Sequence, residues 1–398
     1  MANGGNVETH PVAARRRSRL RLDAEEMVAA ALKHAGRDDF LDRSFYPPLQ
    51  RLIAACNAES DLSAFGRYSV RFDVLRSLNN LLEFENVELL HPQVLARPIE
   101  RPLFIMGMPR SGTTFLHGLV AQHPDTIAPL AYQTVYPNPS PSGRLGDKLR
   151  QGWIEGQLRF VRILAPELNS LHPISAASPQ ECTDITSQVF QSLRYDSVYR
   201  VPSYQRWLER HGHVDAYRFH RRFLRHLDVQ MPGRRWVLKS PDHVFALSAL
   251  RTVYPDARLV FVHRDPVRVL ASVAKLTEVL RRPFARSIDL GDIGRQVCAS
   301  WVDGAQRMMR AAAGSDSILH LHYRQIVGAP LETASRLFRH AGLALTEEAT
   351  RRMQRWLERD SKSSKPRRNY NLATFGLDAA TLRAQFAPYI EAFGVERE

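Results

Sequence analysis

The hydrophobic pattern of the chain first changes near residue 102. Residues 24 to about 92 carry the signals of helices separated by loops. At residue 102 a short continuous apolar run, PLFIM, replaces that pattern, and such runs are typical of strands buried on both faces of a parallel sheet. A glycine-containing loop follows, and Phe115, Leu116, Leu119 and Val120 then form the apolar face of a helix.

Strands that alternate with helices return at residue 235. We expect strands at RWVLKS (235–240), ARLVFVH (257–263) and SILHLHY (317–323). Helices are expected at 241–254, where Pro241 suits the first turn, at 265–280, where Asp265 is the N-cap, and onwards to about 358. This alternation predicts an α/β fold with a central, mostly parallel sheet flanked by helices.

Three regions are predicted from these patterns. Residues 1–22 are polar, end in ARRRSRLRL and are expected to be a disordered basic tail. Residues 23–98 form a helical N-terminal region that begins at Asp23, with Glu26 three positions later as in a capping box. Residues 99–398 form the α/β domain, and a proline-rich stretch at about 125–232 is expected to be a helical insertion that covers a substrate.

Charge, cysteine content and the length of the apolar runs limit the partners, sites and location that we expect for the protein. Lysine and arginine number 55 against 41 acidic residues, a formal net charge of +14 in 398 residues. A basic surface of this kind suits nucleic acid, anionic lipid or a multiply phosphorylated small molecule, and also an ordinary solvated surface. The three cysteines are scattered without a CxxC pair, which disfavours a zinc site and a disulfide framework. No apolar run approaches 18 residues, so we expect a cytoplasmic protein for which only peripheral membrane contact is open.

The loop after the first strand has the spacing of a phosphate-binding loop. Gly107 and Gly112 form the GxxxxG half of the motif, and Thr113 stands where nucleotide hydrolases carry lysine. Backbone amides of such a loop cradle phosphate oxygens, and Arg110 supplies the missing positive charge from within it. Without the lysine, and without an evident acidic strand end to hold Mg²⁺, hydrolysis of ATP or GTP is disfavoured.

PRSGTTFL within this loop resembles the 5′-phosphosulfate loop of sulfotransferases that use 3′-phosphoadenylyl sulfate (PAPS). The segment LVFVHRDPVRVLASV is similar to their 3′-phosphate segment, and an arginine at a strand end and a hydroxyl on the next helix can converge on one phosphate. The resemblance covers about residues 100–390, is closest to long bacterial members, and implies a P-loop-like fold with PAPS as co-substrate and no metal. It implies donor contacts at Pro109, Arg110, Ser111, Gly112, Thr113, Thr114, Arg264, Ser272 and Tyr323.

Two further segments extend the resemblance. WVLKSPDHVFAL matches the strand end where the family carries a lysine, which implies that Lys239 contacts the transferring sulfuryl group. SKSSKPRRNYNLATFGL looks like the basic loop that closes over the nucleotide, with Lys365, Arg367 and Arg368 near the 3′-phosphate. The implied reaction moves a sulfuryl group to a hydroxyl or amine of a small-molecule, lipid or glycan acceptor, with Arg110 and Lys239 neutralising charge.

The general base is the open position in this comparison. Many relatives carry an acidic residue after the loop helix, but the matching position here is Gln133, which cannot accept a proton. LHPISAASPQECTDI offers His172 and Glu181 instead, and His117 and His263 stay open. The alternatives are a P-loop kinase or NTPase, a nucleic-acid-binding module, and a PAPS-binding protein with weakened catalysis.

Overall fold

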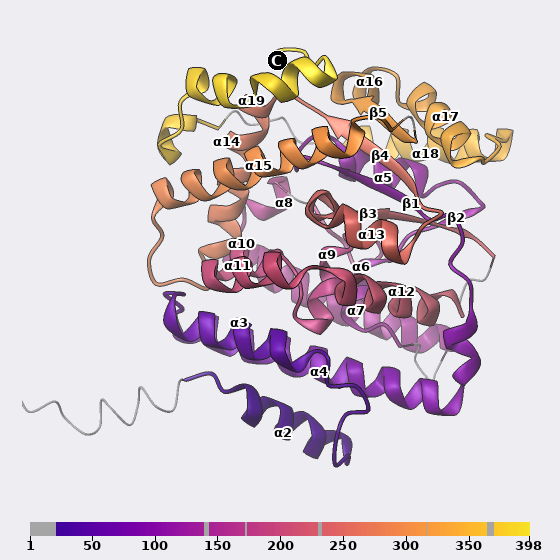
Figure 1. Cartoon of the computed structure of the whole chain (residues 1–398). Coiled ribbons are helices and arrows are strands. Elements are labelled where there is room, and N and C mark those ends of the chain that lie inside the picture. The colour runs from indigo at the N-terminus through magenta and orange to yellow at the C-terminus, as the bar shows by residue number, and fades with distance from the viewer. Residues whose placement is uncertain (1–20, 139–142, 172, 230–232, 316, 364–369) are drawn as a thin grey trace, which may run out of the picture.

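The computed structural model describes residues 21–138, 143–171, 173–229, 233–315, 317–363 and 370–398. Within these ranges five strands form one parallel sheet in the order β2-β3-β1-β4-β5 (Figure 1). The strands are β1 (Leu103–Gly107), β2 (Thr126–Ile127), β3 (Arg235–Lys239), β4 (Arg258–His263) and β5 (Ile318–His322). The α/β prediction with a mostly parallel sheet is therefore confirmed.

Both faces of the sheet are covered, and the side chains of β1 alternate between the hydrophobic clusters on the two faces. Leu103 and Ile105 join one hydrophobic cluster with residues of α5 (Thr113–Val120), α16 (Tyr323–Gly328), α17 (Pro330–Ala341) and α18 (Glu347–Ser363). Phe104 and Met106 join the larger cluster, which includes residues of α12 (Val214–Asp228), α13 (Leu247–Val253), α15 (Leu290–Ala312) and α19 (Ala379–Phe393). This burial explains why the central strands β1 and β4 are almost wholly apolar in sequence, whereas β5 at the edge of the sheet carries two histidines.

The helices that follow β3 lie mostly around the sheet and its carboxyl end (Figure 1). They are η3 (Pro241–Ala246, 3₁₀), α13 (Leu247–Val253), α14 (Pro266–Arg281), α15 (Leu290–Ala312), α16 (Tyr323–Gly328), α17 (Pro330–Ala341), α18 (Glu347–Ser363), η4 (Leu372–Phe375, 3₁₀) and α19 (Ala379–Phe393). Asp265 caps α14 by accepting from the Val267 amide at 3.0 Å, as predicted.

Helices also fill the chain before β3. The N-terminal ones are α2 (Ala24–Ala35), α3 (Tyr46–Ala58), α4 (Ala64–Leu90) and η1 (Pro92–Ala96, 3₁₀). Those between β1 and β3 are α5 (Thr113–Val120), α6 (Ala131–Val135), α7 (Gly143–Leu164), α8 (Leu168–Leu171), α9 (Thr183–Thr186), η2 (Ser187–Val189, 3₁₀), α10 (Arg194–Tyr199), α11 (Pro202–His211) and α12 (Val214–Asp228). Asp23 caps α2 through the Glu26 amide, as its position in the sequence predicts.

The structure differs from the predicted elements at two places. Strand β2 lies inside the stretch expected to be a helical insertion, and it pairs with β3 at the edge of the sheet. Two residues are too few to give an alternation pattern, so the sequence carries no signal for it. The helix expected over 241–254 is divided into a 3₁₀ turn and α13, because Ser240 caps the Asp242 amide and tightens the first turn.

Among the described residues, no helix combines the length and the apolar character needed to cross a bilayer.

Candidate functional site

The phosphate-type loop lies between the carboxyl ends of β1 and β4. Gly107 has φ 145°, and a Cβ there would stand 2.3 Å from the Val262 carbonyl oxygen of β4. Gly112, with φ 94°, is the N-cap of α5, and a Cβ there would meet the Tyr323 ring at 3.1 Å. Only glycine fits both positions without displacing a neighbour.

The residues between these glycines form a tight turn. Arg110 has φ 63°, a conformation that costs a non-glycine residue on the order of 1 kcal/mol or more. The Ser111 hydroxyl donates to the Met108 carbonyl at 2.6 Å and is fully buried. The hydroxyl of Ser111 therefore holds the turn, and the amides at the start of α5 are the groups that a loop of this kind uses to bind an anion.

Arg110, Arg264, Ser272 and Tyr323 lie together beside the loop. The Arg110 Nε donates to the Ser272 Oγ at 3.1 Å across 162 residues of sequence. The Arg264 NH1 donates to the Arg110 carbonyl at 2.6 Å, and its guanidinium lies 3.7 Å from the centre of the Tyr323 ring. The sequence-predicted donor residues of three separate segments thus converge at one place.

The Glu398 carboxylate, which the sequence analysis did not predict at this site, forms an ion pair with Arg264. Glu398 accepts from the Arg264 Nε at 2.9 Å and from NH2 at 2.8 Å, and its own amide donates to Asp265 at 3.0 Å. The pair is mostly shielded from solvent. Arg264 binds a planar anion here through its two-pronged edge, which is the geometry it would use for a phosphate.

Lys239 ends β3 directly beside the first turn of α5. Its Nζ donates to the Thr114 Oγ1 at 3.1 Å and forms a close ion pair with the Glu181 carboxylate. Lys239 is only 1% exposed, whereas the Glu181 side chain keeps 20% of its surface open. One buried cation therefore contacts both a hydroxyl at the start of α5 and a partly accessible carboxylate.

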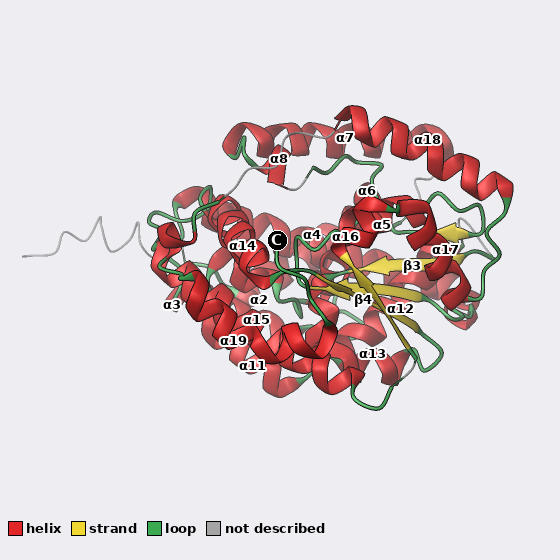
Figure 2. Ribbon diagram, turned by 90° about the horizontal axis from the view of Figure 1, so that it is seen from above, coloured by secondary structure: helices red, strands yellow, loops and turns green. Residues whose placement is uncertain are grey.

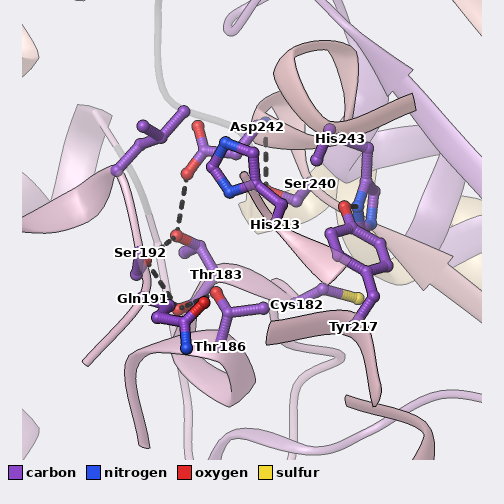
Figure 3. A pocket seen from close by; sticks show the side chains of 12 residues that line it. Cys182, Thr183, Thr186, Gln191, Ser192, His213, Tyr217, Ser240, Asp242 and His243 are labelled. Atoms are coloured by element: carbon purple, nitrogen blue, oxygen red, sulfur yellow. Dashed lines mark hydrogen bonds between the residues drawn. The ribbon is translucent and has the colours of Figure 1, made fainter. Parts of the chain in front are cut away.

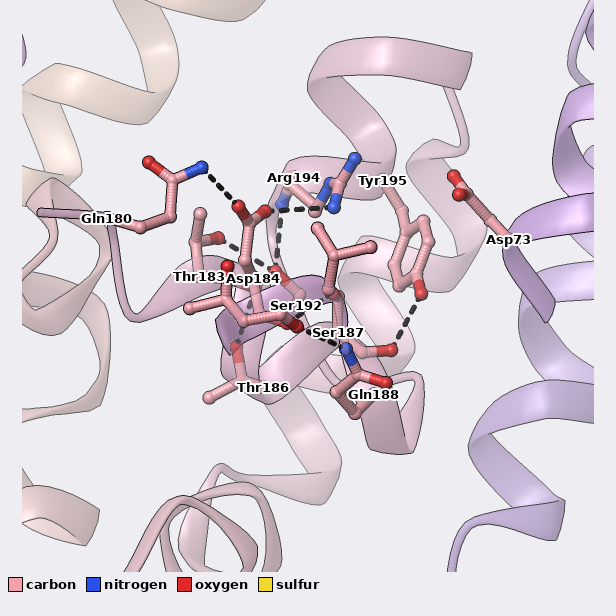
Figure 4. A network of polar contacts seen from close by, with 12 residues as sticks. Asp73, Gln180, Thr183, Asp184, Thr186, Ser187, Gln188, Ser192, Arg194 and Tyr195 are labelled. Carbon is pink, nitrogen blue, oxygen red and sulfur yellow. Dashed lines mark hydrogen bonds and ion pairs between the residues drawn. The ribbon is translucent and has the colours of Figure 1, made fainter. Parts of the chain in front are cut away.

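The segment that carries Glu181 is fixed from both sides. The Cys182 amide donates to the Lys239 carbonyl at 2.9 Å. Asp184 accepts from Gln180 at 2.6 Å and from Arg194 at 2.9 Å, within the polar network that Figure 4 shows. These contacts restrict the backbone on both sides of Glu181, and they therefore hold its side chain next to Lys239.

A small cavity, lined by both polar and apolar side chains, lies beside this segment (Figure 3). Its walls come from Cys182 and Thr183 on one side and from Ser240, Asp242 and His243 on the other. Asp242 accepts from the Thr183 hydroxyl at 2.9 Å. Burial raises the pKa of Asp242 to about 6, although the Thr183 bond and the Lys239 charge favour its ionised form.

This shift has a consequence for stability. We expect the wild type to lose stability relative to Asp242→Asn as pH rises from about 4 to about 6, because the folded protein penalises the ionised carboxylate while the unfolded chain ionises near 3.8. The difference in Tm between the two proteins should grow over that window and then level off. Thermal unfolding at pH 4 to 8 measures it. Asp38→Asn, at an exposed site, is the control, and a difference for Asp242→Asn that is independent of pH would contradict the assignment.

Gln133, at the position where relatives carry the acidic residue, and the candidate bases His117 and His263 all have structural contacts. Gln133 is buried and its side chain accepts from the Leu130 amide at 3.0 Å, so it caps α6. His117 is fully buried against the Val237 carbonyl, and burial lowers its pKa to about 3. His263 lies between Tyr389 and His320, and burial holds its pKa well below the usual value.

Some predicted residues lie outside the described ranges. His172, Lys365, Arg367 and Arg368 belong to this group, so their predicted roles are untested. Within the described part of the chain no group of three or more His, Cys, Asp or Glu side chains is arranged to hold a metal ion.

A family model described as "Sulfotransferase family" matches residues 102–347. Among curated proteins, the omega-hydroxy-beta-dihydromenaquinone-9 sulfotransferases Stf3 of Mycobacterium bovis and Mycobacterium tuberculosis are each 25% identical over 276 residues. Each alignment covers 66% of this chain and 68% of the relative.

Two solved structures share the whole architecture. Sulfotransferase STF9 from Mycobacterium avium superposes with a TM-score of 0.85 and 28% identity, covering 94% of this chain and 97% of its own. Sulfotransferase STF1 from Mycobacterium tuberculosis gives a TM-score of 0.80 and 29% identity, covering 92% and 99%. These likenesses include the N-terminal helices, because they extend well beyond the residues matched by the family model.

Proposed function

Since the chain belongs to the sulfotransferase family, we propose that it transfers the sulfuryl group of PAPS to the hydroxyl of an acceptor through the site built on Lys239 and Glu181. The observation that carries this proposal is the contact of the Lys239 Nζ with both the Thr114 hydroxyl of the phosphate loop and the Glu181 carboxylate. Through this contact Lys239 connects the loop that would hold PAPS with Glu181, the carboxylate that would take the proton of the acceptor. A cytoplasmic location remains our prediction.

We assign the 5′-phosphosulfate and the 3′-phosphate of PAPS to two separate sets of residues. The loop amides and Arg110 would hold the 5′-phosphosulfate. Arg264 and Ser272 would hold the 3′-phosphate, with the Tyr323 ring keeping the Arg264 guanidinium flat against it. When the nucleotide binds, Arg110 would give up its hydrogen bond to Ser272 and contact the donor instead. Glu398 would leave Arg264 at the same step.

The reaction then follows from positions and charges. The acceptor oxygen attacks sulfur in line with the bridging oxygen of PAPS, and its proton passes to the Glu181 carboxylate. The bond from sulfur to the bridging oxygen breaks, and 3′-phosphoadenosine 5′-phosphate (PAP) leaves with the electron pair on that oxygen. Lys239 stabilises the charge that develops there, in a site from which its burial excludes water.

We also propose a lipid alcohol as the first acceptor class to test. The relative Stf3 is named for a hydroxylated dihydromenaquinone, a lipid with a terminal hydroxyl. The apolar surface described below agrees with a substrate of that kind.

Thermal shift with nucleotides tests the donor assignment. We expect PAP to raise the Tm more than ATP with Mg²⁺, and Arg264→Ala to weaken PAP binding by about 10- to 100-fold while changing the affinity for adenosine 5′-phosphate little. Arg251→Ala, at an exposed arginine of α13, is the matched control. Stabilisation by ATP with Mg²⁺ alone would favour a kinase or NTPase, and equal losses for both adenosine nucleotides would remove Arg264 from the 3′-phosphate site.

The contact of Glu398 with Arg264 makes a separate prediction. Glu398→Gln should bind PAP about threefold to tenfold more tightly than wild type, because the nucleotide no longer has to displace a carboxylate from the arginine. Isothermal titration with PAP measures the change. Glu396→Gln removes the exposed neighbouring pair with Arg324 and should leave the affinity unchanged. Unchanged affinity in Glu398→Gln would show that this carboxylate does not compete with the donor.

A further inference from the structure

Helix α7 presents an apolar face to solvent. It crosses beside the rest of the domain, with α8 following at one end (Figure 2). Five of its residues are between 51% and 69% exposed, a large fraction for apolar side chains, and we call them the α7 face: Leu145, Leu149, Trp153, Phe160 and Ile163. Their spacings of four, four, seven and three residues place them on one side of a helix of 22 residues, about 33 Å long.

The opposite side of α7 already has its own partners. Ile154 packs with Tyr132 and Ala176 in a small hydrophobic cluster, and Arg150 donates to the Tyr136 carbonyl at 2.8 Å. The inward side is therefore satisfied, and the α7 face is a second apolar surface. Contiguous exposed apolar surface of this extent marks a contact site in most proteins.

The charge around the α7 face is basic. Lys148 and Arg159 are exposed and lie along one edge of the stripe, three turns apart on the helical period. The acidic residues of the helix are paired: Asp147 with Arg150, and Glu155 with Arg162 at 2.9 Å. An apolar stripe edged by exposed cations matches the boundary between headgroups and acyl chains of an anionic bilayer.

The apolar surface continues onto α4. The Phe160 ring meets the Phe65 ring edge-on at 6.2 Å, and Phe65 in turn stacks on Phe284. Tyr68 and Phe72 stack on each other one and two turns further along and are also exposed. The patch thus spans two helices that have a rigid aromatic contact, which gives it a fixed shape.

We propose that the α7 face is a docking surface for an anionic lipid bilayer, with α7 lying in the plane of the interface. The docked helix leads directly to the donor site, since α8 follows it and the Leu171 carbonyl of α8 accepts from Arg110. Docking would deliver a hydroxylated lipid acceptor to the site, and this last step rests on the proposed function, whereas binding to the bilayer does not.

Vesicle flotation tests the docking. We expect the protein to float with phosphatidylcholine vesicles that contain 30% phosphatidylglycerol and to bind pure phosphatidylcholine at least about fivefold more weakly. Leu149→Glu combined with Trp153→Glu should lower binding by about tenfold or more. Leu89→Glu combined with Leu90→Glu, at exposed leucines of α4, is the matched control and should float as wild type. Retained PAP binding in each variant shows that it is folded and keeps the donor site separate from the result.

Tryptophan fluorescence supplies a second measurement. Of the five tryptophans, all within the described ranges, Trp153 alone is exposed. Its emission should shift to the blue on anionic vesicles and be quenched by lipids brominated near the headgroup end of the acyl chain, and Trp153→Phe should lose both effects. The proposal is overturned if wild type does not float. It is also overturned if light scattering shows a dimer that the Leu149/Trp153 variant dissociates while vesicles have no effect, because the α7 face is then a contact between copies.

Discussion

Replacing Glu181 with glutamine is expected to lower kcat for sulfuryl transfer by about 100- to 10,000-fold, with PAP affinity within about twofold of wild type. Glutamine fills the same space and can still accept from the Lys239 Nζ, but it cannot take the acceptor's proton. Single-turnover transfer from labelled PAPS, with PAP binding measured separately, gives both quantities. Turnover should fall and binding should not.

The control for this change is Glu167→Gln, because Glu167 pairs with Lys275 and Arg282 near α8 and is assigned no chemistry. Its turnover should stay within a few-fold of wild type. Full activity in Glu181→Gln would move the base elsewhere, and His172→Ala, at a position outside the described residues, is then the decisive variant. Wild-type turnover as low as that of Glu181→Gln would instead indicate a PAPS-binding protein with weakened catalysis.

Replacing Lys239 with methionine is expected to lower kcat by about 100- to 1,000-fold, equal to roughly 2.7–4 kcal/mol of transition-state stabilisation. Methionine fills the buried volume of the lysine stem but removes the cation that faces the bridging oxygen. The change also leaves Glu181 without its ion pair. Rates with donors of different leaving-group pKa measure the effect, and the loss should be greatest for the poorest leaving group.

Lys275→Met is the matched control, since this lysine also pairs with glutamates, Glu167 and Glu278, but lies on α14. The double variant of Lys239→Met and Glu181→Gln should cost much less than the sum of the two single losses, because the two residues act as one unit. Additive losses would show that the lysine and the glutamate act in independent steps, and a kcat within a few-fold of wild type in Lys239→Met would remove the lysine from the reaction.

Much of the fold could be predicted because its signals are local. The apolar runs of β1, β3 and β4 are nearly continuous since these strands are covered on both faces, whereas β5 at the sheet edge is interrupted by two histidines. Asp23 and Asp265 mark their helices because capping involves only the next few residues. The loop from Gly107 to Thr114 is one contiguous motif, so its spacing alone indicated an anion site.

The sequence by itself thus determined the strand and helix alternation, the phosphate-type loop and the residues that resemble the donor contacts of sulfotransferases. Only the tertiary structure showed that Glu181 contacts Lys239: the two residues are 58 apart in sequence and come together because β3 pairs with β1 beside α5. Glu398 pairs with Arg264 across 134 residues of sequence. Helix α7 has apolar residues on two sides, and only its inward contacts show which side is left exposed. Periodicity and motif spacing report neighbours along the chain, whereas ion pairs and exposed faces depend on which distant segments the fold places beside them.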